Sequence, residues 1–251
     1  MNFLIKSRVV YVFCMGFTLA VSGKETITIK ADDGVEITAD LYLAHDKNAP
    51  FIVLFHQAGW SRGEYLEIAP KLNAMGFNCL AVDQRSGGAV NGLKNQTHLS
   101  AIELGKKTTY LDALPDMIKA INYCREHYAK GKLLIWGSSY SSSLVIKIAG
   151  DHSGLIDGAL AFAPGEYFSR FGKSKNFIAQ SAGRIDKPVF ITSAKNEKNN
   201  WWAIYQAIPS ADKVYFLPET NGNHGSRALW EKFGDHLDYW NSVKDFLNKI
   251  M

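Results

Sequence analysis

Residues 133–144 read LLIWGSSYSSSL, and this stretch decides the fold class. The apolar run at 133–136 is typical of a strand buried at the centre of a sheet. Small residues follow at 137–141, and the apolar residues beyond them, up to Ile148, have the spacing of a helix. A buried strand that turns sharply into a helix is the repeating unit of a parallel α/β sheet, so we expect that architecture for the chain.

The rest of the chain alternates strands and helices in the same way. The pattern predicts a single domain with a mostly parallel central sheet and helices on both faces. Pro115 predicts a kink in its helix, or a helix that starts later than residue 109. The segment 163–188 is too short for a large separate cap. Strands are expected at 26–30, 35–42, 51–55, 78–82, 133–136, 158–162, 189–192 and 214–217, and helices at 64–75, 109–128, 142–148 and 237–249.

The N-terminus has the pattern of a secretory signal peptide over residues 1–22. Lys6 and Arg8 form a positive start, and the apolar stretch 9–21 is too short to span a membrane. The small residues Ala20 and Ser22 favour cleavage after residue 22, with cleavage after residue 23 as the second choice, and the first choice leaves one domain at 23–251. We therefore expect a secreted or periplasmic protein; the alternative is a short N-terminal membrane anchor.

Composition narrows the partners and cofactors. The net charge of +4 is small, so nucleic acid and anionic membranes are not expected as partners. The mature chain keeps Cys79 and Cys124, which are either one disulfide or two buried thiols, and their strand and helix patterns favour thiols. Neither cysteines nor histidines have metal-ligand spacing, so no metal or other cofactor is predicted. The oligomeric state stays open.

Ser139 is the candidate nucleophile, because it lies at the sharp bend between the strand at 133–136 and the following helix. Such a bend exposes a hydroxyl and requires small neighbours two residues away, which Gly137 and Ser141 provide. The helix N-terminus adds free N–H groups and a positive dipole beside it. The alternative is a serine cluster that only caps the helix.

A serine nucleophile needs a base and an acid that orients the base. His224 lies in the loop NGNHG after the last predicted strand, at the position where a base can reach a strand-end serine. Glu197 follows the strand at 189–192 and is our first choice of acid. Glu166, after the preceding strand, is the rival, and Asn196 stands where the acid usually lies.

The remaining candidate site residues lie in the loop after the strand at 51–55 and in segments that follow later strands. The N–H of Tyr140 and the N–H of Ala58 are the predicted oxyanion donors, with Gln57 as the alternative to Ala58. His56 is expected to brace this loop rather than react. Trp60 and Trp201 are the predicted substrate-binding side chains. Other aromatic candidates for the pocket are Tyr167, Phe168 and Trp202.

Several motifs together resemble α/β-hydrolases of the dienelactone hydrolase and carboxylesterase type. In chain order they are VLFHQAGWSRGEY, CLAVDQRSGG, WGSSYSS, FAPGEYF, PVFITSAKNE and NGNHGSRAL, and the resemblance covers about residues 25–250. It implies a triad of Ser139, Glu197 and His224, an acyl-enzyme and no metal. Ser141 and Gln57 replace glycines of that pattern. Dienelactone hydrolases use a cysteine nucleophile, so their substrate does not carry over.

The expected function is hydrolysis of carboxylic esters with small or short acyl groups, because no large cap is predicted over the site. One alternative is a serine peptidase or another acyl hydrolase on the same fold. The other is a binding module that has kept the fold and lost its chemistry.

Overall fold

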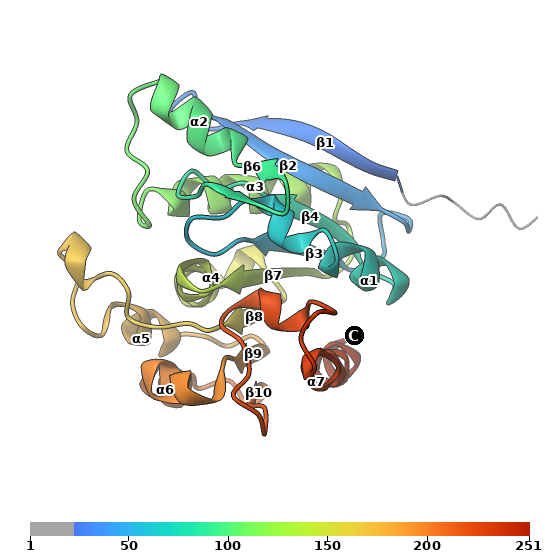
Figure 1. The fold of residues 1–251 in the computed structure, drawn as a ribbon, viewed down its shortest axis with the longest axis vertical. Helices are drawn as coiled ribbons and strands as arrows, with labels where there is room; N and C mark the ends of the chain where they lie inside the picture. Colours follow the sequence, from blue (N-terminus) through green and yellow to red (C-terminus); the bar gives the residue numbers. More distant parts are fainter. Residues whose placement is uncertain (1–22) are drawn as a thin grey trace, which may run out of the picture.

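The computed structural model describes residues 23–251, so the predicted signal peptide lies outside the described residues. Its centre is an eight-stranded sheet in the order β1-β2-β4-β3-β7-β8-β9-β10, and β5 and β6 form a separate small hairpin (Figure 1). The strands are β1 (Gly23–Lys30), β2 (Glu36–Leu43), β3 (Phe51–Phe55), β4 (Asn78–Val82), β5 (Ala89–Val90), β6 (Leu93–Lys94), β7 (Leu133–Ser138), β8 (Gly158–Phe162), β9 (Val189–Thr192) and β10 (Lys213–Phe216).

Helices connect and cover these strands, with short 3₁₀ turns between them (Figure 1). The α-helices are α1 (Ile68–Ala74), α2 (Gln96–Glu103), α3 (Ala113–His127), α4 (Tyr140–Asp151), α5 (Phe177–Ala182), α6 (Lys198–Ala207) and α7 (His236–Ile250). The 3₁₀ turns are η1 (Arg62–Tyr65), η2 (Ser153–Leu155), η3 (Ser169–Phe171), η4 (Lys195–Glu197) and η5 (Ser226–Leu229).

The sheet is mostly parallel, as the sequence predicts. From β4 through β3 and on to β10, each strand runs parallel to its neighbour. The antiparallel pairs of this sheet are β1–β2 and β2–β4, so β2 joins the β1–β2 hairpin to the parallel strands. Crossover helices are what allow sequential strands to be parallel, so the alternation read from the sequence is confirmed as a single α/β domain.

Side chains of the central strands alternate between the two faces of the sheet. In β3, Val53 belongs to the core under α3, α4, α5 and α6, whereas Leu54 belongs to the core under α1 and α7. Ile135 and Trp136 of β7 divide in the same way. Because both faces of the strands are covered, almost every residue in them is apolar, which is why the runs FIVLF and LLIW identify them.

The two central strands meet where the chain changes direction across the sheet. After β3 the chain moves outward to β4, then returns to place β7 on the other side of β3. Phe55 at the end of β3 pairs with Gly137 near the end of β7, so the loops that follow the two strands lie next to each other. In open α/β sheets, such a switch point at the carboxyl ends is where ligands bind.

Two helices are shorter than the sequence pattern predicts, and proline explains both. The segment expected as one helix at 64–75 is the turn η1 followed by α1, which begins at Ile68. Pro70 has no N–H to bond to the carbonyl of Leu66, so a regular helix cannot run through that bond. Pro115 acts similarly in α3, which begins at Ala113 rather than Thr109.

The cysteines are two buried thiols, as expected. Cys79 in β4 packs on the α1–α7 side of the sheet, and Cys124 in α3 packs on the opposite side. The sheet therefore lies between them, and they do not pair. Burial raises the thiol pKa of both residues.

The close approach of β7 and α4 generates a testable prediction at Gly137. A Cβ at this position would lie 2.5 Å from both the carbonyl oxygen of Ser141 and the Cα of Ser142. Gly137→Ala should therefore lower the free energy of unfolding by ~3 kcal/mol or more, as measured by urea denaturation. In the control Gly154→Ala the new Cβ meets nothing within 4 Å. Equal stability of the two variants would contradict the prediction.

Candidate active site

The turn between β7 and α4 holds Ser139 in a conformation that side-chain-bearing residues rarely adopt. Its φ is 58° and its ψ is −123°. Such a conformation costs ~1–3 kcal/mol and persists only where the surroundings impose it. Here the N–H of Ser139 donates to the carbonyl of Phe162 in β8 at 2.7 Å, while its carbonyl accepts from Ser142 in α4. The bend leaves the Ser139 side chain half-buried at the carboxyl edge of the sheet.

Ser141 replaces the usual glycine without opening the turn. Its hydroxyl donates to the carbonyl of Phe55 at 2.8 Å and accepts the N–H of Ser138 at 2.9 Å. The side chain thus fills the gap between β3, β7 and α4 with hydrogen bonds to the backbone. The steric limit falls on Gly137 instead, where no Cβ fits.

His224 faces Ser139 across the carboxyl edge of the sheet. Its Nε2 lies 2.8 Å from the Ser139 Oγ. The loop after β10 carries the histidine, and Gly225 beside it has a φ of 74°. A Cβ on Gly225 would lie 2.5 Å from the Ser138 Oγ, so glycine is what lets this loop come close to the nucleophile turn.

Glu197 contacts the other nitrogen of His224. Its Oε1 lies 2.5 Å from His224 Nδ1, and its Oε2 accepts the N–H of Ala194 at 3.2 Å. Glu197 ends η4, immediately after β9, and its side chain is 19% exposed. A carboxylate on Nδ1 directs the lone pair of Nε2 toward the serine hydroxyl. Neighbouring Asn196 is exposed.

Glu166, the rival acid, has a different role. Its carboxylate accepts the N–H of Ile178 at 2.9 Å and the N–H of Ala179 at 2.9 Å, at the start of α5. These bonds satisfy free N–H groups at the helix N-terminus, where a negative charge is favourable. The structure therefore brings Glu197, and not Glu166, to the histidine.

The predicted oxyanion donors lie in the two loops that flank the switch point. Tyr140 is the first residue of α4, so its N–H has no acceptor within that helix. Ala58 is half-buried in the loop after β3. The alternative donor, Gln57, uses its N–H on the carboxylate of Glu64 at 2.8 Å. Ala58 is thus the better placed of the two.

His56 braces the loop, as predicted. Its ring is fully buried, its Nδ1 lies 2.8 Å from the carbonyl of Gln57, and its Nε2 lies 3.1 Å from the side-chain amide of Asn95. Burial lowers the pKa of His56 to about 4. The imidazole is therefore neutral at ordinary pH, with Nδ1 donating and Nε2 accepting.

The prediction that Trp201 binds substrate is wrong. Its side chain is fully buried in α6, and its Nε1 donates to the Ser193 hydroxyl at 2.8 Å. The ring packs α6 against the sheet and is closed to a ligand. Phe168 is also fully buried. Trp60 is half-buried and stacks on Trp230 with ring centroids 5.3 Å apart, so its substrate role stays a prediction.

Two residues of the site escaped the sequence reasoning. Glu64 is fully buried in η1, and its Oε1 accepts the hydroxyl of Ser138 at 2.7 Å. Ser138 in turn accepts the N–H of Ser226 at 2.9 Å. In the sequence, Glu64 looks like a solvent-facing residue at the start of a helix. Nothing in the surrounding motif SRGEY predicts that this carboxylate is buried.

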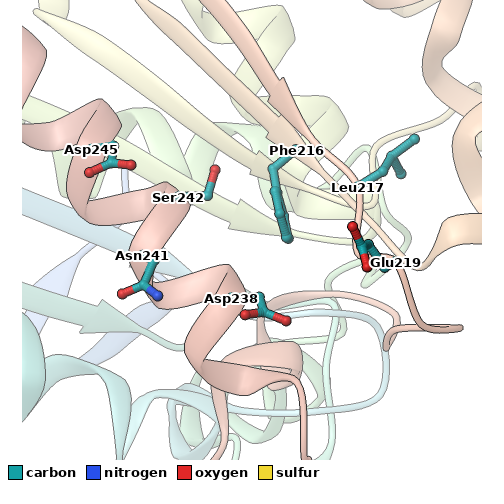
Figure 2. A pocket seen from close by; sticks show the side chains of 7 residues that line it. All are labelled: Phe216, Leu217, Glu219, Asp238, Asn241, Ser242 and Asp245. Atoms are coloured by element: carbon teal, nitrogen blue, oxygen red, sulfur yellow. The ribbon is translucent and has the colours of Figure 1, made fainter.

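A pocket of about 630 Å³ lies apart from these residues, along the outer strand β10 and α7. Figure 2 shows Asp238 and Asp245 on the helix and Glu219 beyond the end of the strand. Ser139, His224 and Glu197 are absent from its walls. The reactive side chains therefore meet at the switch point and not in this acidic pocket.

Comparisons with known proteins agree with this architecture. A family model described as "Serine aminopeptidase, S33" matches residues 46–170. A search of curated protein sequences finds no match.

Within the part of the chain that the structure describes, every helix is too short or too polar to cross a bilayer.

Solved structures share the fold at low sequence identity. A Pyrococcus furiosus esterase aligns with a TM-score of 0.67 and 18% identity, over 90% of this chain and 92% of the esterase. Est1E from Butyrivibrio proteoclasticus, with ferulic acid bound, has a TM-score of 0.68 and 14% identity, over 89% of this chain and 98% of its own. A dienelactone hydrolase from Anabaena variabilis has a TM-score of 0.69 and 9% identity, over 90% and 97%. The chain therefore has the fold of these α/β-hydrolases, and the family model matches its residues 46–170.

Proposed function

We propose that this protein is a serine hydrolase that cleaves carboxylic esters with small or short acyl groups through an acyl-enzyme. The observation that carries the proposal is the continuous contact from Ser139 Oγ to His224 Nε2 at 2.8 Å and from His224 Nδ1 to Glu197 Oε1 at 2.5 Å. A hydroxyl, an imidazole and a carboxylate in this order are the groups that acyl transfer requires.

The proposed reaction has two halves. In the first, His224 Nε2 takes the Ser139 proton while the serine oxygen attacks the ester carbonyl, and the N–H groups of Tyr140 and Ala58 bind the resulting oxyanion. The C–O bond to the alcohol breaks, and His224 returns the proton to the departing oxygen. In the second half, water loses its proton to His224 and attacks the acyl carbon; the bond from that carbon to the Ser139 oxygen then breaks, and His224 returns the proton to the serine oxygen as the acid leaves. Glu197 stabilises the imidazolium in each half.

The preference for small esters rests on what covers the site. Segment 163–188, the usual place for a cap, forms η3 and the short helix α5. Such a segment leaves Ser139 half-buried and accessible from solvent. That solved esterases share the fold supports ester chemistry, and the "Serine aminopeptidase" description supports a peptidase as the second candidate. Hydrolysis of amino-acyl nitroanilides faster than p-nitrophenyl esters would favour the peptidase.

A labelling experiment tests the nucleophile. The purified domain should react covalently with a fluorophosphonate probe, because the probe captures a serine activated by an imidazole. Ser139→Ala should abolish labelling. Ser142→Ala, which changes a serine three residues further along in α4, should retain it. Gel fluorescence with peptide mapping measures the outcome. Labelling that persists in Ser139→Ala would refute the assignment of the nucleophile. A wild type that does not react with the probe would favour the alternative of a non-catalytic binding module.

A matched pair of variants tests the acid. Glu197→Gln should lower kcat on p-nitrophenyl acetate by about 10³- to 10⁴-fold, because the amide no longer stabilises the imidazolium. Glu166→Gln keeps a carbonyl oxygen for the N-terminus of α5, so its kcat should stay within about twofold of wild type, with a stability loss of ~1 kcal/mol. A larger loss of kcat in Glu166→Gln than in Glu197→Gln would assign the role of the acid to Glu166.

We also propose that the protein is exported and that its leader is cleaved after residue 22. The support is the charge and hydropathy pattern of residues 1–22 and the small residues at its end. N-terminal sequencing of the exported protein should begin at Gly23. An exported product that retains Met1 would contradict the proposal and favour an anchor.

A further inference from the structure

The carboxylate of Glu64 is buried directly behind the candidate active site. Glu64 is 0% exposed, and both of its oxygens accept hydrogen bonds. Oε1 accepts from the Ser138 hydroxyl at 2.7 Å, and Oε2 accepts from the N–H of Gln57 at 2.8 Å. A buried carboxylate is costly unless its environment compensates for the lost solvation, so its retention here needs a reason.

The two bonds of Glu64 reach the oxyanion loop and the nucleophile turn, and a third bond, made by Ser138, reaches the histidine loop. Gln57 precedes Ala58, the proposed oxyanion donor. Ser138 precedes the nucleophile, and its hydroxyl also accepts the N–H of Ser226, two residues after His224, at 2.9 Å. One carboxylate and one hydroxyl therefore connect the oxyanion loop, the nucleophile turn and the histidine loop.

The element that carries Glu64 is itself held firmly. The backbone carbonyl of Glu64 accepts the indole N–H of Trp230 at 2.9 Å, and the hydroxyl of neighbouring Tyr65 donates to the carbonyl of Phe55 at 2.6 Å. Gly225 makes the approach of the histidine loop to this group sterically possible, because a Cβ there would meet Ser138. The carboxylate is thus anchored well enough to fix the position of its partners.

We propose that Glu64 is a positioning residue whose ionised carboxylate sets the relative placement of the oxyanion loop, the nucleophile turn and the histidine loop. This inference rests on the proposed function, since it assigns Glu64 a role in that reaction. Glu64 touches none of the reacting atoms. It acts through Gln57 and Ser138, each of which stands next to a residue of the proposed chemistry.

The charge of Glu64 depends on pH near neutrality. Burial raises its pKa to about 7, against the opposing effects of the Ser138 hydroxyl, the Gln57 N–H and the nearby charges of His224 and Arg227. Tyr65 also faces it, with a phenol pKa that burial and this carboxylate raise. An ionised carboxylate accepts at both oxygens, whereas the acid must donate its proton from one of them. Protonation therefore reverses or breaks one of the two bonds.

The sign of the pH effect follows from this. Above about pH 7 the Glu64 carboxylate is ionised and accepts both hydrogen bonds, from the Gln57 N–H and the Ser138 hydroxyl. Below that pH the carboxyl group is protonated and one of the two bonds is reversed or lost. Activity should therefore fall as pH drops through that value. Glu64→Gln has the same shape and a neutral amide that donates toward Ser138, so it imitates the protonated state at every pH.

The first experiment compares kcat and KM of wild type and Glu64→Gln on p-nitrophenyl acetate between pH 5.5 and 8.5. At pH 8.5 kcat should be about 10- to 100-fold lower in the variant, with KM little changed, because misplaced loops weaken transition-state binding. At pH 5.5 the two rates should converge. A merely structural residue would lower the rate by the same factor at every pH.

Glu67→Gln is the matched control, because Glu67 lies three residues further on, is exposed and bonds only the N–H of Glu231 among the hydrogen bonds of residues 23–251. It should behave like wild type. If Glu64→Gln fails to fold, Ser138→Ala provides the second variant. It removes the donor that lowers the Glu64 pKa, so the pH at which activity falls should move upward.

A thermal measurement tests the titration without using activity. The folded-state pKa of about 7 exceeds the ordinary value of 4.5, so the folded state binds more protons between these values. Raising the pH across that window should therefore lower the free energy of unfolding of the wild type. Glu64→Gln, which has no carboxyl group at this position, should not show this decrease. The melting temperature of the variant relative to wild type should rise from pH 4.5 to pH 7.5.

The outcomes separate the two hypotheses. An active wild type whose ratio to Glu64→Gln is constant with pH, or equals one, overturns the role of Glu64 and leaves the proposed function intact. A melting-temperature difference that does not change with pH also overturns it. A wild type that neither hydrolyses esters nor labels at Ser139 overturns both the function and the role.

Discussion

The contact between the end of β7 and the start of α4 is the constraint on which the site depends. No Cβ fits at Gly137, and the Ser139 backbone is forced to a positive φ. Both follow from a strand and a helix that approach more closely than an ordinary turn permits. In return, a hydroxyl stands above the sheet edge, beside free N–H groups of the helix. The β8 carbonyl that holds the Ser139 N–H shows that the neighbouring strand helps to maintain this geometry.

The architecture could be predicted from the sequence because buried strands have a direct signature. FIVLF and LLIW are apolar on both faces, and short apolar runs of this kind are typical of a sheet covered on both faces. The helix α2 escaped prediction because it buries only Thr97 and Ala101, which gives too weak an apolar stripe. The start of the helix expected at 64–75 was misplaced because Pro70 removes a backbone donor, an effect that spacing alone does not weigh, whereas the later start of α3 agrees with one of the two expectations drawn from Pro115.

The site was predictable where chain order carries information and unpredictable where tertiary packing decides. Ser139, His224 and Glu197 follow particular strands, so a parallel sheet brings them to one edge. Trp201 was misjudged because an aromatic residue in a helix after a strand has no sequence mark that separates core from pocket. Glu64 was overlooked for the opposite reason, since a carboxylate is expected in solvent unless the fold encloses it.

The placement of the two thiols on opposite sides of the sheet has a consequence for how the domain tolerates its surroundings. Cys79 and Cys124 cannot meet without dismantling the central strands, and burial keeps both in the unreactive thiol form. The native state therefore gains nothing from an oxidant and loses nothing to a reductant. The folded residues 23–251 therefore contain no disulfide that the redox poise of a compartment would have to form or maintain.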